Sequence, residues 1–475
     1  MSAALPVAVI GGGPVGLAAA AHLVTRGVPV KLYEAGATVA AHVHDWAHVR
    51  LFSPWGFNTD SAATAVLREH GWQAPPAAAL PTGGDLYSAY LQPLSETPTR
   101  KRVIETGARV RNVTRAGIDK VMSRGRGDYP FALSIDSRAG GLRIELARAV
   151  IDASGTWASQ NPVGASGIPA AGETTFADRI AYGIPDVLGR DRATYAGRRV
   201  LVIGGGHSAA NVLLDLARLA ETDPRLKIVW AVRASNLARV FGGGAADKLA
   251  ARGALGDDLR RLVESGELEV TLAFAAERIS EVEDGLTVSN QAGRALGPVD
   301  RIVVCAGQRP DLTMTRELRL DFDPWLESAR SLGPMIDPNL HSCGSVPPHG
   351  YKELAHPEPG YFAVGIKSYG RAPTFLMATG YEQVRSVVAH LAGDEAAAND
   401  VRLVLPETGV CSTNIVAELA ANAGCCGGPP PADSSACCAD DATAKASGAA
   451  GCGCGPVEAK PVTVSTSSCG GARNA

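Results

Sequence analysis

The stretch VAVIGGGPVG, from Val7 to Gly16, decides the fold of this chain. Val7 to Ile10 is a short apolar run of the kind that forms a buried strand, and the glycines after it fit the pattern G-x-G-x-x-G. From Val15 to Arg26 the apolar residues have helical spacing, and a second apolar run, Val30 to Tyr33, closes on Glu34. The order strand, glycine turn, helix, strand predicts a Rossmann-like domain that binds a dinucleotide.

Each glycine of this turn has its own role in holding a pyrophosphate. Gly11 permits the tight turn, Gly13 lets a phosphate approach the backbone, and Gly16 lets the helix pack closely on the sheet. The helix N-terminus offers free N–H groups and a partial positive charge to the phosphates. Glu34 can accept hydrogen bonds from ribose hydroxyls. The position of this site near the N-terminus favours FAD as its ligand.

A second unit of the same kind begins at the strand Arg198 to Ile203. Its glycine turn carries an alanine in place of the third glycine, and its second strand, Lys227 to Val232, is followed by Arg233. A site specific for NADH would carry an acid there, whereas a guanidinium suits the adenosine 2′-phosphate in charge and in geometry. We therefore expect NADPH at this second site, in contact with Gly204, Gly206, Ser208, Ala209 and Arg233.

Two further junctions complete a resemblance to a known superfamily. Asp152-Ala153-Ser154-Gly155 and Cys305-Ala306-Gly307 each follow a buried strand. Together with the paired glycine turns, over residues 5 to 393, they resemble the flavoproteins with two dinucleotide-binding domains, which include flavin-containing monooxygenases and pyridine-nucleotide–disulfide reductases. The resemblance implies an α/β fold with two Rossmann-like domains, and it places Gly155 and Gly365 near the FAD.

The resemblance also implies the order of the domains along the chain. A discontinuous FAD-binding domain is expected at 1–195 and 311–395, with the NADPH-binding domain inserted at 196–310. Residues 396–475 are expected to be a linker and a cysteine-rich tail.

A narrower resemblance concerns the chemistry. The segment from Trp46 through RLFSPW (50–55), the run AYGIP (181–185) and the tail with adjacent cysteines are similar to flavin-dependent monooxygenases of bacterial arsenic-resistance operons. This similarity implies a flavin reaction linked to trivalent arsenic. The chain departs from related families in two respects. It has no FxGxxxHxxxW sequence between the glycine turns, and no cysteine precedes Cys305, so no C-x-x-C lies near the first turn.

Two residues after the first unit are candidates for contact with FAD, one at the flavin and one at the adenine end. A monooxygenase must exclude water and keep a hydrogen-bond donor at the reacting face of its flavin. Asn58 follows the irregular segment after Trp55 and is our candidate for that catalytic donor. Arg50 is a candidate to stack on the cofactor or to bond to it.

The cysteines gather at the C-terminal end of the chain. Eight of the ten lie after residue 410, and Ala, Gly, Ser and Pro surround them, so we expect disorder from about Asn422 onward. Adjacent thiols suit soft, thiophilic ions such as As(III). A cytosolic cluster of this kind indicates metal binding or redox work rather than a disulfide framework. The predicted ligands of a soft ion are Cys425, Cys426, Cys437, Cys438, Cys452 and Cys454.

The overall composition excludes several other classes of function. The net charge of −3 gives no basic surplus for nucleic acid and no charge block for a membrane surface. No stretch of the sequence approaches the length of about 20 consecutive apolar residues that a membrane-spanning helix needs. The start, MSAALPVAVIGGG, has no basic segment before its apolar run, so we interpret it as a first strand and expect a cytoplasmic protein.

Three functions remain in competition. The first is an NADPH- and FAD-dependent monooxygenase that acts on a small-molecule substrate, with a tail that binds a metalloid. The second is a reductase in which the tail cysteines carry electrons from the flavin to a disulfide or a metal. The third is a metalloid-binding chaperone.

Overall fold

The computed structural model describes residues 5–138, 140–341, 346–403 and 405. The chain divides into a unit at Met1–Thr413 and a second at Asn414–Ala475. The whole second unit lies outside the described residues, so the predictions of disorder and of an ion bound by the six tail cysteines fall there and are not addressed by the structure. No helix in the described ranges is long and apolar enough to span a membrane.

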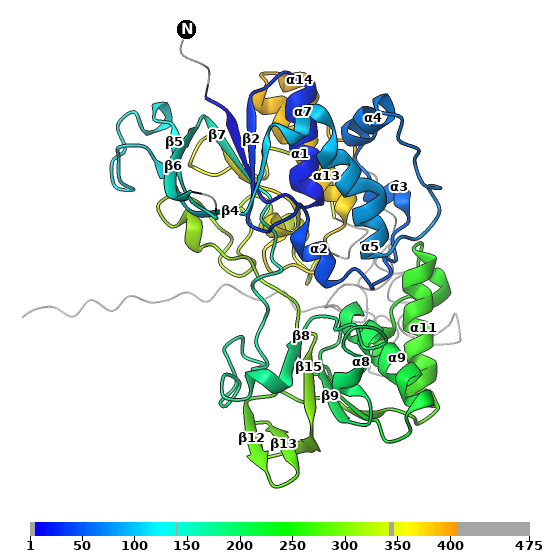
Figure 1. Ribbon diagram of the computed structural model, residues 1–475. Helices are drawn as coiled ribbons and strands as arrows, with labels where there is room; N and C mark the ends of the chain where they lie inside the picture. Colours follow the sequence, from blue (N-terminus) through cyan, green and yellow to red (C-terminus); the bar gives the residue numbers. More distant parts are fainter. Residues whose placement is uncertain (1–4, 139, 342–345, 404, 406–475) are drawn as a thin grey trace, which may run out of the picture. The chain divides into compact units, whose positions relative to one another are not determined.

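The first unit contains a parallel five-stranded sheet built around the stretch quoted above (Figure 1). Its order is β16-β7-β1-β2-β3, with the carboxyl ends of all strands at one edge. The central strand β1 is buried at every position, which explains its uninterrupted apolar sequence. The strands are β1 (Val7–Ile10), β2 (Val30–Glu34), β3 (Ile104–Thr106), β7 (Ala149–Asp152) and β16 (Tyr361–Ala363).

A second parallel sheet repeats this order in four of its five strands, and its outermost strand β8 comes before the central strand in the chain, whereas β16 comes last in its domain. It runs β11-β10-β9-β15-β8, with the strand before the second glycine turn again in the centre. Its members are β8 (Ile180–Tyr182), β9 (Arg199–Ile203), β10 (Lys227–Ala231), β11 (Glu269–Thr271) and β15 (Arg301–Val304). The expected α/β fold with two Rossmann-like domains is confirmed.

One strand of the second parallel sheet precedes residue 196, where the sequence predicts the second domain to begin. Strand β8 pairs in parallel with β15, Ile180 opposite Ile302, and so completes the second sheet from before that boundary. Val163 and Ala170 also pack in the core of this sheet. The reason is physical: β15 needs a partner on its outer side, and the three-residue strand that supplies it is too short to recognise from an apolar pattern.

Each parallel sheet is accompanied by a three-stranded antiparallel sheet. One follows β3 and precedes β7, and the other follows β11 and precedes β15. The duplication therefore extends beyond the glycine turns to the central strand, the two strands after it, the antiparallel sheet and the strand that follows, but not to the outermost strands β16 and β8. The first antiparallel sheet is β4 (Ala108–Arg115), β5 (Phe131–Ser137) and β6 (Gly141–Ala147), and the second is β12 (Arg278–Val282), β13 (Gly285–Ser289) and β14 (Ala295–Val299).

Helix α1 (Pro14–Thr25) packs between the first sheet and α13 (Met377–Leu391). It is buried from Val15 to Leu23, and its run of four alanines, 18–21, lets the neighbouring elements approach closely. The corresponding helix of the second domain is α9 (His207–Thr222), which packs against α11 (Ala250–Glu264). The other α-helices are α2 (Ala41–Asp45), α3 (Trp55–Asn58), α4 (Ser61–Glu69), α5 (Gly83–Leu86), α6 (Gln92–Glu96), α7 (Pro98–Lys101), α8 (Arg192–Tyr195), α10 (Ala238–Phe241), α12 (Gly333–Ile336) and α14 (Glu395–Asn399).

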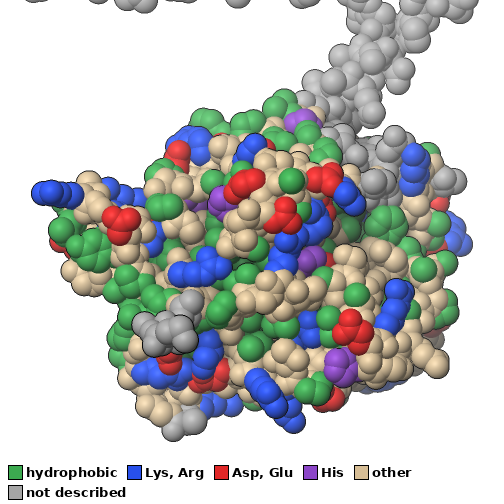
Figure 2. All heavy atoms as spheres, turned by 90° about the horizontal axis from the view of Figure 1, so that it is seen from above, with side chains coloured by type: hydrophobic (Ala, Val, Ile, Leu, Met, Phe, Trp, Pro, Cys, Tyr) green, Lys and Arg blue, Asp and Glu red, His purple; other side chains and the backbone are tan. Residues whose placement is uncertain are grey.

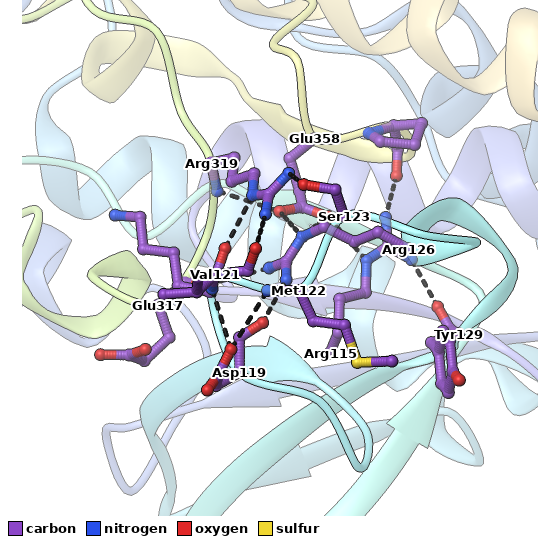
Figure 3. A network of polar contacts seen from close by, with 12 residues as sticks. Arg115, Asp119, Val121, Met122, Ser123, Arg126, Tyr129, Glu317, Arg319 and Glu358 are labelled. Atoms are coloured by element: carbon purple, nitrogen blue, oxygen red, sulfur yellow. Dashed lines mark hydrogen bonds and ion pairs between the residues drawn. The ribbon is translucent and has the colours of Figure 1, made fainter.

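A buried ionic cluster joins the first antiparallel sheet to the segment before β16 (Figure 3). The carboxylate of Glu358 is fully buried and accepts hydrogen bonds from Arg115 at 2.8 Å and Arg126 at 3.0 Å. The backbone N–H of Arg319 donates to the same carboxylate at 2.9 Å. Burial alone would raise the pKa of Glu358, but these hydrogen bonds outweigh it and the pKa is lowered. The cluster thus ties together segments more than 200 residues apart.

We predict that Glu358→Ala lowers the free energy of unfolding by about 3–5 kcal/mol, because it leaves two buried guanidinium groups without their carboxylate. Thermal or urea unfolding of the full chain measures the effect. The matched control is Asp136→Ala, which removes the partner of Arg111 in an exposed ion pair and should cost less than about 1 kcal/mol. Equal losses in the two variants would contradict the assignment.

Candidate nucleotide-binding sites

The first glycine turn is shaped by contacts that exclude any side chain. Gly11 has a φ of +96°, and a Cβ atom there would lie 2.6 Å from the carbonyl oxygen of Ala153, just after β7. A Cβ at Gly16 would lie 1.9 Å from the carbonyl oxygen of Gly11. Gly13 differs, because a Cβ there would meet nothing within 4 Å. The turn is therefore closed at its first and third glycines and open at its second, where a pyrophosphate is expected to approach.

The N-terminus of α1 is free to bind an anion. Its N-cap is Gly13, no side chain caps it, and Pro14 opens its first turn. Helices α11 and α13 lack a side-chain cap as well, so it is the open space beside Gly13 that distinguishes this helix end. The uncapped end matches the phosphate site that the sequence predicts.

Glu34 braces the turn and forms part of the site. Its Oε2 accepts a hydrogen bond from the N–H of Gly12 at 2.7 Å, and its Oε1 accepts one from Gly36 at 2.6 Å. The side chain is mostly buried, at 8% exposure. Each carboxylate oxygen has a further lone pair, so Glu34 can still accept bonds from ribose hydroxyls.

These elements line a cavity of about 240 Å³. Five predicted cofactor residues meet there from distant parts of the chain: Gly11, Gly13, Glu34, Gly155 and Gly365. Gly16 lies beneath the turn rather than in the wall. The remaining walls are largely apolar and include Val15, Trp46, Trp157, Val364, Ile366, Phe375 and Met377. The open space at Gly13, the uncapped helix and the acceptor Glu34 fit FAD.

A buried lysine supports the wall of this cavity. Lys367 Nζ lies 2.7 Å from Asp152 Oδ2 and 3.0 Å from Ser154 Oγ. The hydroxyl of Tyr361 donates to the same Asp152 oxygen at 2.9 Å. The ion pair fixes the segment after β7 against the segment after β16, and both segments line the cavity. No motif in the sequence singles out Lys367. The one feature that could have pointed to it is its position two residues after Gly365.

The second glycine turn repeats the first in detail. A Cβ at Gly204 would lie 2.3 Å from the carbonyl oxygen of Cys305, and a Cβ at Gly206 would meet nothing within 4 Å. Helix α9 also has no side-chain cap at its N-terminus, where Ser208 is half-buried. Ala209 is fully buried in the place of the third glycine. We call each glycine turn, together with the helix N-terminus that follows it, a cradle. The residues predicted to hold a second dinucleotide thus form the second cradle.

The register of the strands corrects one assignment. Ile10, directly before the first turn, pairs with Tyr33, and Ile203, directly before the second, pairs with Ala231. The counterpart of Glu34 is therefore Val232, one residue earlier than Arg233. An apolar side chain stands where the first site has its carboxylate, and the exposed Arg233 follows it, with a hydrogen bond from its Nη1 to the carbonyl oxygen of Ala165 at 3.0 Å.

His207, in the first turn of α9, contacts the first domain. Its ring lies 5.3 Å from that of Phe52, and the guanidinium of Arg252 lies 5.8 Å from the same phenyl ring. Arg252 is held by a buried ion pair with Asp247 at 2.7 Å. Burial, with the nearby Arg252, lowers the pKa of His207 from its ordinary value of 6.5 to about 4. The imidazole is therefore neutral at physiological pH.

Two residues predicted to contact FAD, Asn58 and Arg50, do not line the cavity. Asn58 is fully buried outside the cavity, and its amide donates to the carbonyl oxygen of Ser53 at 2.6 Å and accepts from the Ser53 hydroxyl at 2.8 Å. It closes the short helix α3 instead of facing a ligand. Arg50 is exposed, donates to the carbonyl oxygen of Leu80 at 2.9 Å, and does not line the cavity either.

Comparisons with known proteins agree with this architecture. A family described as NAD(P)-binding Rossmann-like domain matches residues 9–72, which include the first glycine turn. A search of curated protein sequences finds no match. The fold is similar to bacillithiol disulfide reductase from Bacillus cereus, with 18% identity, a TM-score of 0.59, and coverage of 82% of this chain and 99% of that one.

Two flavin enzymes of a different reaction type are similar as well. A flavin-containing monooxygenase from Stenotrophomonas maltophilia has 21% identity and a TM-score of 0.53, with 82% of this chain and 99% of that one covered. The FAD-bound cadaverine monooxygenase of the desferrioxamine pathway from Erwinia amylovora has 12% identity and a TM-score of 0.60, with 86% and 98% covered. At these identities the likeness is one of fold.

We predict that Gly13→Ala weakens FAD binding at least about tenfold without unfolding the chain, because the new methyl group enters the open space of the cradle. Flavin uptake by the apoprotein and its melting temperature measure the two effects separately. Gly56→Ala is the control, since its Cβ would make only ordinary contacts and lies outside the cavity. Unchanged flavin affinity in Gly13→Ala would contradict the assignment of this site.

We also predict that the chain loses stability as the pH falls from 6.5 to about 4. The unfolded chain binds a proton at His207 in this window and the folded chain does not, so the free energy of unfolding falls with falling pH. His207→Gln should reduce the slope of the free energy of unfolding against pH by the equivalent of up to one proton. Unfolding at a series of pH values measures this slope. A slope that is the same in both proteins would show that His207 does not carry it.

Proposed function

We propose that this chain is an NADPH- and FAD-dependent oxidoreductase of the monooxygenase type, with FAD at the first glycine turn and NADPH at the second. The proposal depends on one difference between two otherwise matching cradles: the first carries a carboxylate and the second a guanidinium. The first has the carboxylate of Glu34 at the ribose position, and the second has Val232 there, followed by a guanidinium. A ribose with a free 2′-hydroxyl suits the first, and a 2′-phosphate suits the second.

The residues of the chain bind and orient the two cofactors. The first-turn N–H groups of α1 and α9 would bind the two pyrophosphates, and Glu34 would accept bonds from a ribose. Bound FAD would supply the acceptor for hydride from NADPH and the chemistry with O₂. The apolar side chains of Val364, Ile366 and Met377 would keep water from the reacting face.

In the described part of the chain, no thiol is placed to take electrons from a flavin bound in the first cavity. No described cysteine lines the first cavity. Cys305 is buried behind the second turn, where its thiol donates to the carbonyl oxygen of Gly183, and burial raises its pKa to about 12. A buried neutral thiol of this kind is a poor nucleophile. This favours an oxygenase over a disulfide reductase that uses this part of the chain.

We further propose that the tail binds a trivalent metalloid such as As(III) as substrate or cargo. The support is the sequence alone: the pairs Cys425-Cys426 and Cys437-Cys438 and the C-G-C at 452–454 offer soft ligands at close spacing. In the described part of the chain, no group of three or more His, Cys, Asp or Glu side chains could hold a metal ion. The competing hypotheses are a reductase whose tail cysteines relay electrons and a chain that acts only as a metalloid-binding chaperone.

The oxygenase proposal is tested by NADPH consumption in air and under argon, in the full chain and in a variant with the six tail cysteines changed to serine. We expect turnover that needs oxygen, survives the serine substitutions and gives an oxygenated product. Anaerobic turnover that is lost with the cysteines would instead establish the reductase. As(III) binding without turnover under either atmosphere would establish the chaperone.

We predict that Arg233→Ala raises KM for NADPH by about ten- to a hundredfold and leaves KM for NADH unchanged, because the lost group is a charged partner of the 2′-phosphate alone. Steady-state kinetics with each nucleotide measures the difference. Arg225→Ala removes an equally exposed arginine beyond the far end of α9 and should change neither value. An equal loss with NADPH and NADH in Arg233→Ala would contradict the assigned specificity.

A further inference from the structure

Strand β6 carries an apolar row on its exposed face. Leu142, Ile144 and Leu146 alternate along the strand and are 69%, 63% and 41% exposed. The residues between them, Arg143 and Glu145, lie on the other face, where the guanidinium of Arg143 reaches Glu105 at 2.7 Å. The strand thus reverses the usual pattern of an edge strand, whose exposed face is polar.

The exposed row also lies at the edge of its sheet. Within the described ranges β6 has β5 as its only strand partner, with Ile144 opposite Ser134 and Leu146 opposite Ala132. Figure 1 draws β5 and β6 at the left-hand margin of the first unit, and Figure 2 shows hydrophobic and charged side chains side by side on the left of that unit. An edge strand of this kind is a template for a further strand.

The sequence of β6 determines which strand would fit. From 142 to 146 it reads L-R-I-E-L, which is symmetric about Ile144 in apolar character and opposite in charge at 143 and 145. An antiparallel copy centred on Ile144 would place Leu142 opposite Leu146 and Arg143 opposite Glu145. A parallel copy in register would place each charge opposite itself, which is unfavourable.

We propose that β6 pairs with β6 of a second copy of this chain, antiparallel and centred on Ile144, to form a continuous six-stranded sheet and a dimer. The two apolar rows then lie on one face as neighbours and shield each other from water. On the other face, Arg143 of each copy meets Glu145 of the second copy. The guanidinium has five donors, so its bonds to Glu105 and Glu145 of its own chain leave donors for this contact.

The pairing is tested first by the oligomeric state of the full chain in analytical ultracentrifugation. We expect a dimer, and we expect Ile144→Lys to shift it to the monomer, because two ammonium groups would face each other at the centre of the pair. Val282→Lys is the matched control, since it places the same charge on the exposed edge strand β12 and should leave the dimer intact. Thermal unfolding of both variants verifies that they remain folded.

The register is tested by cross-linking through introduced cysteines. Residues directly opposite have Cβ atoms about 4.5–5.5 Å apart, so Ile144→Cys should cross-link to itself. Leu142→Cys and Leu146→Cys should each fail alone and cross-link when mixed. Mass spectrometry of the linked peptides separates these bonds from those of the native cysteines. A monomeric wild-type chain, a dimer that survives Ile144→Lys, or linkage of Leu142→Cys to itself would overturn the proposal.

Discussion

One steric constraint organises each half of the described structure. The first glycine of each turn lies so close to the chain leaving β7 or β15 that a Cβ would be 2.6 Å from Ala153 O in one domain and 2.3 Å from Cys305 O in the other. This closeness holds the turn at the carboxyl edge of the sheet, at the point where the strand order reverses. The helix that follows must then begin over that edge, with its free N–H groups directed outward.

The two cradles differ in the side chain at the end of their second strand, and this difference determines how each could hold a nucleotide. In the first, Glu34 accepts hydrogen bonds from Gly12 in the glycine turn and from Gly36 in the loop after β2, so this carboxylate is part of the structural frame. In the second, Val232 contributes only packing, and charge is supplied by an exposed arginine outside the frame. Under the proposed function, the first site would hold its cofactor through the structural frame, and the second would hold its nucleotide through an exposed side chain.

Much of the fold and of both cradles could be predicted from the sequence, because glycine spacing and buried apolar strands are local patterns. Gly155 and Gly365 were predicted through a resemblance, and the cavity brings them together with Gly13. Strand β8 was missed because three residues carry no periodic signal. Asn58, Arg50 and Lys367 could not be placed, since the direction of a side chain depends on partners such as Ser53, Leu80 and Asp152 that lie elsewhere in space.

The central claim is that the two glycine turns are separate sites for different dinucleotides. Calorimetric titration of the apoprotein with FAD, and then of the FAD-loaded protein with NADP⁺, tests it most directly. The account predicts one FAD per chain, and then one NADP⁺ that binds without displacing the flavin. Failure to take up FAD, or NADP⁺ that competes with FAD for a single site, would contradict it.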